Sequence, residues 1–186
     1  RDALHRRLSR RATMQDGVVI RALQPGDLPA YKALRDAVLA AHPSAFTSDA
    51  AEAQARSAES YRSRLGLDRP EGGHFTLGAW IGAALVGAIS CERETRAKGR
   101  HLSHVVGMMV RDEWQGRAIG RALLVACIAA ARRADGLEML TLSVTAGNAP
   151  AIRLYEAHGF TRYGSLPRAI RVDGRYFAKD LMALAL

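Results

Sequence analysis

One short segment of the sequence carries residues that could bind a phosphorylated ligand. An apolar run, His101–Val110, is followed by Gln115-Gly-Arg-Ala-Ile-Gly120 and then by a helical stripe. At such a strand–loop–helix junction, small residues let backbone N–H groups converge, and the helix adds free N–H groups and the positive end of its dipole. Arg117 and Arg121 add mobile positive charge. The segment predicts a site for a pyrophosphate or a similar anion.

Two common nucleotide-binding loops do not fit this segment. It lacks the Gly-Lys-Ser/Thr of a nucleoside-triphosphate loop. It also lacks a full Gly-x-Gly-x-x-Gly with an acidic residue about 20 positions later. Taken alone, the spacing of Gly116 and Gly120 is also compatible with a plain helix start.

The segment from Val110 to Gly120 resembles the acyl-CoA-binding motif of the GNAT superfamily of N-acetyltransferases. That motif reads Gln/Arg-x-x-Gly/Ala-x-Gly/Ala after a strand. A second motif of the superfamily is similar to Asn148-Ala-Pro-Ala-Ile-Arg-Leu-Tyr155-Glu-Ala-His-Gly159-Phe160, at the expected distance. The resemblance runs from about Val18 to Leu186. One departure is Ala118, where Gly is common, and the motif tolerates Ala there.

The resemblance implies acetyl-CoA as cosubstrate and direct acetyl transfer to a primary amine of a small molecule or a protein. It implies that the backbone of Met108 and Val110 pairs with the pantetheine arm like an added strand, and that Asn148 hydrogen-bonds the same arm. The arm would enter between strands 101–110 and 139–145, which splay apart. The residues that would hold the pyrophosphate are Gln115, Gly116, Arg117, Ala118, Ile119, Gly120 and Arg121.

Aminolysis of a thioester requires a neutral amine and benefits from a proton donor to the departing thiolate. A tyrosine hydroxyl, with a pKa of about 10, can supply that proton. Tyr155 occupies the superfamily position of this donor. The alternative is a purely structural aromatic ring, packed on its helix together with Ile152 and Leu154.

The sequence indicates the general base less clearly than it indicates the proton donor. Members of the superfamily often place a Glu six residues before the end of the strand that meets the pantetheine arm, and His104 stands at that position. A histidine that titrates near 6.5 accepts a proton at neutral pH, directly or through water. The alternative is a polar residue that lies in a hairpin with His101. Glu92, Glu94 and a water molecule compete for the role of base.

We expect no metal and no covalent nucleophile. His101 and His104 are three residues apart on a predicted strand, so they face opposite sides and cannot chelate together. Cys91 and Cys127 show no metal-ligand spacing, and neither stands at a helix start. Both are predicted to be reduced, buried residues.

The order of the elements predicts α+β packing around a mixed sheet. The resemblance adds that the sheet is mostly antiparallel and flanked by helices, the GNAT-like acyltransferase fold. The expected strands and helices cover Val18–Leu23, Leu28–Leu39, Ser48–Leu65, Phe75–Ile81, Ala84–Glu94, His101–Val110, a helix beginning near Ala118, Met139–Thr145, Asn148–His158, Phe160–Tyr163 and Arg175–Leu186.

Composition indicates one globular domain with a basic front. The 186 residues carry a formal charge of +9, and most of the basic residues are Arg. Residues 1–16 form a basic N-terminal arm, predicted to be flexible, with Met14 as a candidate start; residues 17–186 form the acetyltransferase domain. No apolar run of about 18 residues and no secretory h-region occur, so we expect a cytoplasmic protein without membrane contact.

Two other classes of function compete with an enzyme. One is a sensor that binds acyl-CoA without turnover. The other is a protein directed at nucleic acid, either a binding module or an acetyltransferase acting on charged tRNA, as the basic arm suggests. No RNA-binding motif supports it, and only 6% of the residues are aromatic. A homodimer is left open.

The acceptor is predicted to contact the least diagnostic parts of the chain: the helices near residues 31–65, the link 95–100 and a loop over 165–173. In that loop Arg168 and Arg171 could steer an amine that bears an acid group, or could be solvated surface charges.

Overall fold

The computed structural model describes residues 12–13 and 17–186. It contains one sheet with the strand order β1-β2-β3-β4-β5-β6-β8-β7. The strands are β1 (Ala12–Thr13), β2 (Val18–Ala22), β3 (Phe75–Ile81), β4 (Ala84–Arg93), β5 (Leu102–Val110), β6 (Met139–Thr145), β7 (Thr161–Val172) and β8 (Arg175–Ala185). The helices are α2 (Leu28–Ala41), α3 (Ala50–Ala55), α4 (Ile119–Ala131) and α5 (Ala149–Glu156), with short 3-10 turns that include η2 (Ala58–Leu65).

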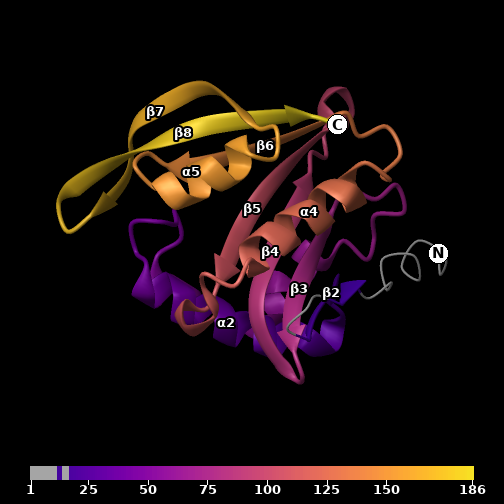
Figure 1. The fold of residues 1–186 in the computed structure, drawn as a ribbon, viewed down its shortest axis with the longest axis horizontal. Helices are drawn as coiled ribbons and strands as arrows, with labels where there is room; N and C mark the ends of the chain where they lie inside the picture. Colours follow the sequence, from indigo (N-terminus) through magenta and orange to yellow (C-terminus); the bar gives the residue numbers. More distant parts are fainter. Residues whose placement is uncertain (1–11, 14–16) are drawn as a thin grey trace.

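The sheet is mixed but mostly antiparallel, as predicted. Every neighbouring pair of strands is antiparallel except β5 and β6. Helix α2 with η2 covers one face, and α4 and α5 cover the other (Figure 1). The α+β fold with helices flanking a central sheet is confirmed.

Two apolar cores hold the helices on the sheet. The stripe predicted on α4 is buried, and Leu123, Leu124 and Cys127 have no exposed surface. Burying a leucine side chain contributes about 1.5–3 kcal/mol, so this stripe fixes α4 firmly beneath the phosphate-loop candidate. On the opposite face, Leu28, Tyr31 and Leu34 of α2 pack against the sheet. The site therefore sits on elements anchored on both faces.

Two predicted elements are wrong in their extent. The single helix expected over residues 48–65 is divided into α3 and η2, because Arg56 and Ser57 adopt extended ψ values of 146° and 155°. The break allows Tyr61 and Leu65 to join the core beneath α2. The closing strand expected at 160–163 continues to Val172, so the predicted loop over 165–173 belongs largely to β7.

The extension of β7 follows from its position at the edge of the sheet. It pairs only with β8, as in Ile170 opposite Phe177, so Pro167 is not required to donate a backbone hydrogen bond to a second strand. The register shifts between Leu166 and Ile170, where Arg168 has a φ of 54°. The β7–β8 hairpin projects beyond the rest of the sheet (Figure 1).

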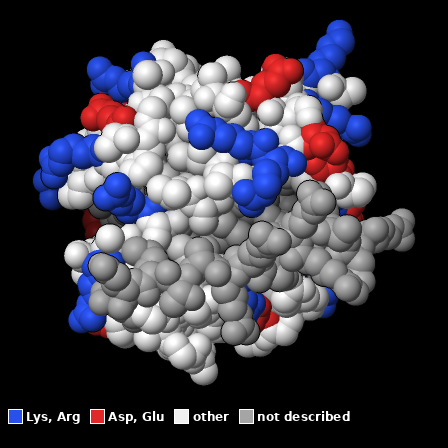
Figure 2. All heavy atoms as spheres, turned by 45° about the vertical axis from the view of Figure 1, so that its right-hand side comes forward, with Lys and Arg blue, Asp and Glu red and all other residues white. Residues whose placement is uncertain are grey.

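The basic N-terminal arm lies largely outside the described residues. Of residues 1–16 only Ala12 and Thr13 are described, and they pair with Ile20 and Val19 of β2. No helix of the described residues is long and apolar enough to cross a membrane. The face in Figure 2 carries Lys and Arg side chains in separate groups, with fewer Asp and Glu between them, and shows no continuous basic surface over its described part.

Candidate active site

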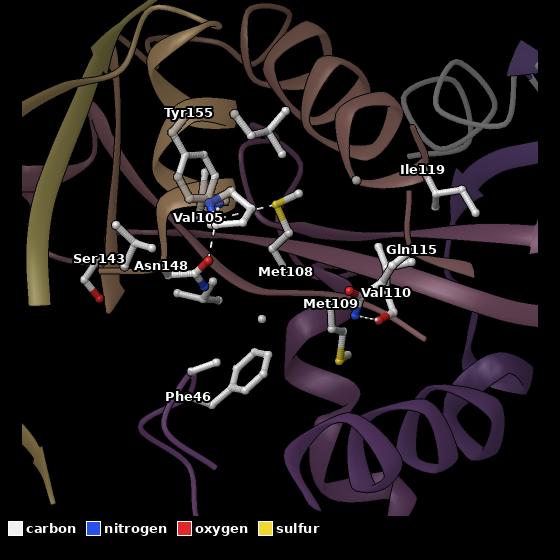
Figure 3. A pocket seen from close by; sticks show the side chains of 18 of the residues that line it. Phe46, Val105, Met108, Met109, Val110, Gln115, Ile119, Ser143, Asn148 and Tyr155 are labelled. Atoms are coloured by element: carbon white, nitrogen blue, oxygen red, sulfur yellow. Dashed lines mark hydrogen bonds between the residues drawn. The ribbon is translucent and has the colours of Figure 1, made fainter. Parts of the chain in front are cut away.

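A cavity of about 520 Å³ lies where β5 and β6 diverge. The two strands pair in parallel over only three residue pairs, from Leu102 opposite Met139 to His104 opposite Thr141. Beyond that point the cavity extends from the start of α4, past α5, to the segment 45–48 (Figure 3).

A β-bulge bends β5 at the start of this gap. Ala88 lies opposite Met109 and Ser90 opposite Val106, so Gly107 and Met108 together face a single residue of β4. Gly107 has a φ of 58°, a conformation that strongly favours glycine. Bulges bend a strand and re-aim its side chains. Here the bulge accompanies the separation of β5 from β6 and places Met108 beside α5.

The start of α4, where the sequence predicts an amide cradle, lies at one end of the cavity. Gly116 and Ala118 have φ values of 74° and 58°, so this loop turns sharply before the helix. A Cβ on Gly120 would lie 3.2 Å from Cε of Met108, so a larger residue there would displace that side chain. The cavity lining includes the predicted residues Gln115, Gly116, Ala118, Ile119 and Gly120.

The two arginines predicted beside the cradle are exposed and are not part of the cavity lining. The guanidinium of Arg117 lies over the ring of Trp114, 4.7 Å from its centroid. Arg121 is one helical turn farther along α4. Both can add positive potential at the mouth of the cradle, but the backbone is the part of this site that faces the cavity.

The edge of β5 that faces β6 is free over the second half of the strand. Met108 and Val110 line the cavity, and the strand pairing between β5 and β6 has ended before them. The Gln115 side-chain amide donates to the Val110 carbonyl at 3.4 Å and to Asp112 Oδ1 at 2.9 Å, which fixes the loop that follows the strand. An extended ligand could therefore hydrogen-bond to this edge as a strand does.

Asn148 caps the second helix of the site. Its Oδ1 accepts a hydrogen bond from the Ala151 N–H at 3.3 Å, so the side chain is fixed at the start of α5. This leaves its amide N–H groups available to a ligand in the cavity, which Asn148 lines. The helix cap and the predicted ligand contact are compatible because they use different atoms of the same amide.

Tyr155 is buried between α5 and β5, with 8% of its surface exposed. Its ring packs edge-on against Phe160, with the centroids 5.7 Å apart, and its hydroxyl donates to Met108 Sδ at 3.3 Å (Figure 3). Burial, with a smaller contribution from Cys127, raises the pKa of Tyr155 to about 12. The hydroxyl therefore stays protonated at neutral pH and can donate a hydrogen bond or a proton.

The candidate general bases lie on the face of the sheet that α4 does not cover. His104 is exposed, its Nδ1 lies 2.5 Å from Thr141 Oγ1, and it is not part of the cavity lining. Glu92, its neighbour on β4, forms an ion pair with Arg64 at 3.4 Å. Hydrogen bonds from Arg96 and from the backbone lower the pKa of Glu94 to about 2, which makes it a poor proton acceptor.

Three cations that sequence reasoning missed line the far end of the cavity. They are Arg35, Arg64 and Lys179, and none of the lining residues is acidic. Lys179 donates to Thr47 Oγ1 at 2.5 Å, and burial lowers its pKa.

One of these cations, Arg35, had a signal in the sequence, because it occupies a position four residues after Tyr31, within the apolar stripe of its helix. By contrast, Arg168 and Arg171 lie against the ring of Tyr176 and outside the cavity lining.

The phosphate cradle, the free strand edge and Tyr155 succeed one another along a single cavity. In the described residues no group of three or more His, Cys, Asp or Glu side chains is arranged to hold a metal ion. The fold and the cavity agree with the class expected from the sequence, the acyl-CoA-dependent acyltransferases. The chain belongs to the acetyltransferase (GNAT) family, whose sequence model matches residues 32–160.

Acetyltransferases of known sequence or structure are similar to this chain. A mycothiol acetyltransferase of Salinispora tropica is 31% identical over 153 residues, which cover 82% of this chain and 47% of that protein. The chain thus spans about half the length of the curated relatives it matches. A GNAT acetyltransferase of Streptococcus pneumoniae shares the fold with a TM-score of 0.82 at 22% identity, covering 91% of this chain and 99% of that one.

A predicted acetyltransferase of Salmonella typhimurium, solved with its cofactor acetyl-CoA, also shares the fold. Its TM-score is 0.78 at 22% identity, and the match covers 91% of this chain and 94% of that one. At these identities the two solved structures establish the fold alone.

Proposed function

We propose that this chain transfers the acetyl group of acetyl-CoA directly to a primary amine of a small molecule or a protein. The observation that carries the proposal is the continuity of one cavity from the α4 cradle, past Tyr155, to an end lined by polar side chains. The pyrophosphate would lie on the cradle, the pantetheine arm along the β5 edge and beside Asn148, and the thioester near Met108 and Tyr155.

In this arrangement the amine nitrogen attacks the thioester carbonyl carbon, a C–N bond forms, and the C–S bond then breaks. The sulfur leaves as a thiolate and receives a hydrogen bond, and then a proton, from the Tyr155 hydroxyl. The excess proton of the amine passes to a base. His104 stays our prediction for that base, acting through water because it is not part of the cavity lining, with Glu92 and water itself as alternatives.

The first experiment combines the purified chain with acetyl-CoA and a library of amines, and reads the release of free thiol. We expect thiol release that depends on a subset of the amines. Calorimetry should show saturable binding of acetyl-CoA. Gly120→Glu should weaken that binding, because it adds bulk beside Met108 and a negative charge at an anion site.

The alternatives correspond to other outcomes of the same experiment. Saturable acetyl-CoA binding with no thiol release from any amine would support a sensor without turnover. The absence of binding at millimolar acetyl-CoA would refute the proposal as a whole.

A further inference from the structure

The end of the cavity away from the cradle holds a buried guanidinium without an anionic partner. Arg35 is 5% exposed, and it forms no ion pair with any described carboxylate. Its Nη2 donates to Ser48 Oγ at 2.7 Å, its guanidinium lies over the Tyr61 ring, and its Nε has no hydrogen-bond partner among the described residues. Buried charges are normally paired, because their desolvation is otherwise costly. Arg35 is thus a charge that lines a cavity and has no counter-ion among residues 17–186.

Two further unpartnered donors converge on the same place. Nη1 of Arg64 and the hydroxyl of Tyr31 are buried and have no hydrogen-bond partner among the described residues. A Cβ on Gly107 would lie 3.3 Å from Arg64 Nη1 and 3.7 Å from both Arg35 Nη1 and the Tyr31 hydroxyl. Two elements, α2 and η2, therefore bring three hydrogen donors to one point beside the bulge of β5. The missing side chain of Gly107 leaves room for them.

We infer that this cluster, Tyr31, Arg35 and Arg64, binds a carboxylate of the amine acceptor, so that the acceptor is an amino acid or a similar small amino-carboxylate. The inference rests on the proposed function and names its substrate class. A planar guanidinium matches a carboxylate through paired N–H donors, and hydrogen bonds to charged groups are among the stronger ones in proteins.

The charge of the cluster favours a carboxylate over a phosphate. Glu92 pairs with Arg64 and offsets one of the two positive charges, so the cluster retains about one unpaired positive charge, on Arg35. A monovalent carboxylate neutralises that charge, whereas a divalent phosphate would leave excess negative charge in a buried place. Lys179 lines the same cavity but donates to Thr47 and Ser143, and it is not among the donors that meet beside Gly107.

The position of the cluster sets the size of the acceptor. Gly107 precedes Met108, whose sulfur meets the Tyr155 hydroxyl, and neighbouring Cα atoms are about 3.8 Å apart. Arg35 and Arg64 line the same cavity as Met108 and Tyr155, so the carboxylate site and the place proposed for the thioester share one space. We expect an amine separated from its carboxylate by one to a few carbons to fit between them, whereas a protein N-terminus without a nearby acid group does not satisfy the cluster.

The test compares matched acceptors that differ only in charge: glycine with glycinamide, and L-leucine with L-leucinamide. Rates are compared at equal concentrations of free amine, because the amide changes the basicity of the amine. We expect the wild type to prefer the carboxylates in kcat/KM by about 10- to 100-fold. Arg64→Gln and Arg35→Lys should remove most of that preference while acetyl-CoA affinity holds. The matched control is Arg168→Gln, which changes an exposed arginine outside the cavity.

Arg35 is buried, so its variants require a check of folding by circular dichroism and melting. Arg64 is partly exposed, and Arg64→Gln keeps the test meaningful if Arg35→Lys does not fold. Equal rates for carboxylates and amides in the wild type, or an equal loss for both in Arg64→Gln, would overturn the inference and leave the acetyltransferase proposal standing.

A binding measurement separates the two proposals when no amine is acetylated. The chain saturated with CoA is titrated with N-acetylglycine and with N-acetylglycinamide, and melting temperature is read. If N-acetylglycine alone raises the melting temperature, and Arg64→Gln abolishes that rise, the result would support the carboxylate site although the transfer reaction fails. No stabilisation by either compound, together with no thiol release, would overturn both.

Discussion

The hydroxyl of Tyr155 donates a hydrogen bond to the sulfur of Met108, 3.3 Å away, across the gap between α5 and the bulged part of β5. Both residues line the cavity in which the thioester of acetyl-CoA is proposed to lie. This orientation of the phenol toward a sulfur atom supports the proposed role of Tyr155 as hydrogen donor to a thiolate that leaves at the same place. Burial holds this hydroxyl in its protonated form.

Tyr155→Phe should lower turnover without weakening acetyl-CoA binding. The substitution removes one oxygen and keeps the ring against Phe160, so the packing of α5 is preserved. General acid catalysis typically contributes about 10²- to 10⁴-fold, and we expect kcat to fall within that range. Steady-state kinetics and calorimetry measure the two quantities separately. Normal turnover by the variant would mean that Tyr155 is only a packing residue.

The same substitution should change stability at alkaline pH. Burial raises the Tyr155 pKa from 10.0 to about 12, so the folded state favours the protonated phenol. That contribution is complete below pH 10 and is lost as the pH rises through 12, so the wild type loses about 1 kcal/mol by pH 11 from this group. Tyr155→Phe lacks this loss. Denaturant unfolding from pH 8.5 to 11.5 should show that the free energy of unfolding of the wild type falls relative to that of the variant as the pH rises. A difference in free energy that stays constant with pH would contradict a raised pKa of Tyr155.

The loop proposed to hold a phosphate could be located from the sequence because its parts are adjacent along the chain. A strand, a small-residue loop and the apolar stripe of α4 follow one another within residues 101–131, and local pattern alone specifies them. The buried stripe of α2 was equally readable from its helical spacing. The second motif placed Tyr155 and Asn148 at the cavity by resemblance, and both line it.

The acceptor end could not be predicted because it is assembled from distant segments. Arg35, Arg64 and Gly107 come from three elements, and only the fold brings them together. The bulge that aims Gly107 is a matter of strand register, which the sequence pattern does not reveal. The alternation of side chains along a strand predicted that His104 and His101 face opposite sides of the sheet. It could not show that the His104 side chain contacts Thr141 and is not part of the cavity lining.

His104→Gln should lower turnover chiefly at neutral and lower pH. At those pH values the amine is protonated and requires a base, whereas at higher pH the free amine forms without help. The pH profile of kcat/KM for the variant should therefore approach that of the wild type as the pH rises. Glu92→Gln is the matched control on the neighbouring strand. A profile of His104→Gln parallel to that of the wild type would transfer the role to Glu92 or to water.

Ala118→Gly should stabilise the fold, because Ala118 occupies a conformation that costs a residue with a Cβ. Its φ of 58° at the N-cap of α4 is left-handed, and this explains why glycine is common at that place in related motifs. A left-handed alanine costs roughly 1–2 kcal/mol, and the greater freedom of glycine in the unfolded chain offsets up to about 1 kcal/mol of that. We expect the free energy of unfolding, measured with denaturant, to rise by up to about 1 kcal/mol, with acetyl-CoA affinity unchanged.

The control is Ala122→Gly, one turn into the same helix, which should instead lower the free energy of unfolding by about 0.5–1 kcal/mol. Equal losses in both variants would mean that the left-handed geometry at residue 118 carries no strain.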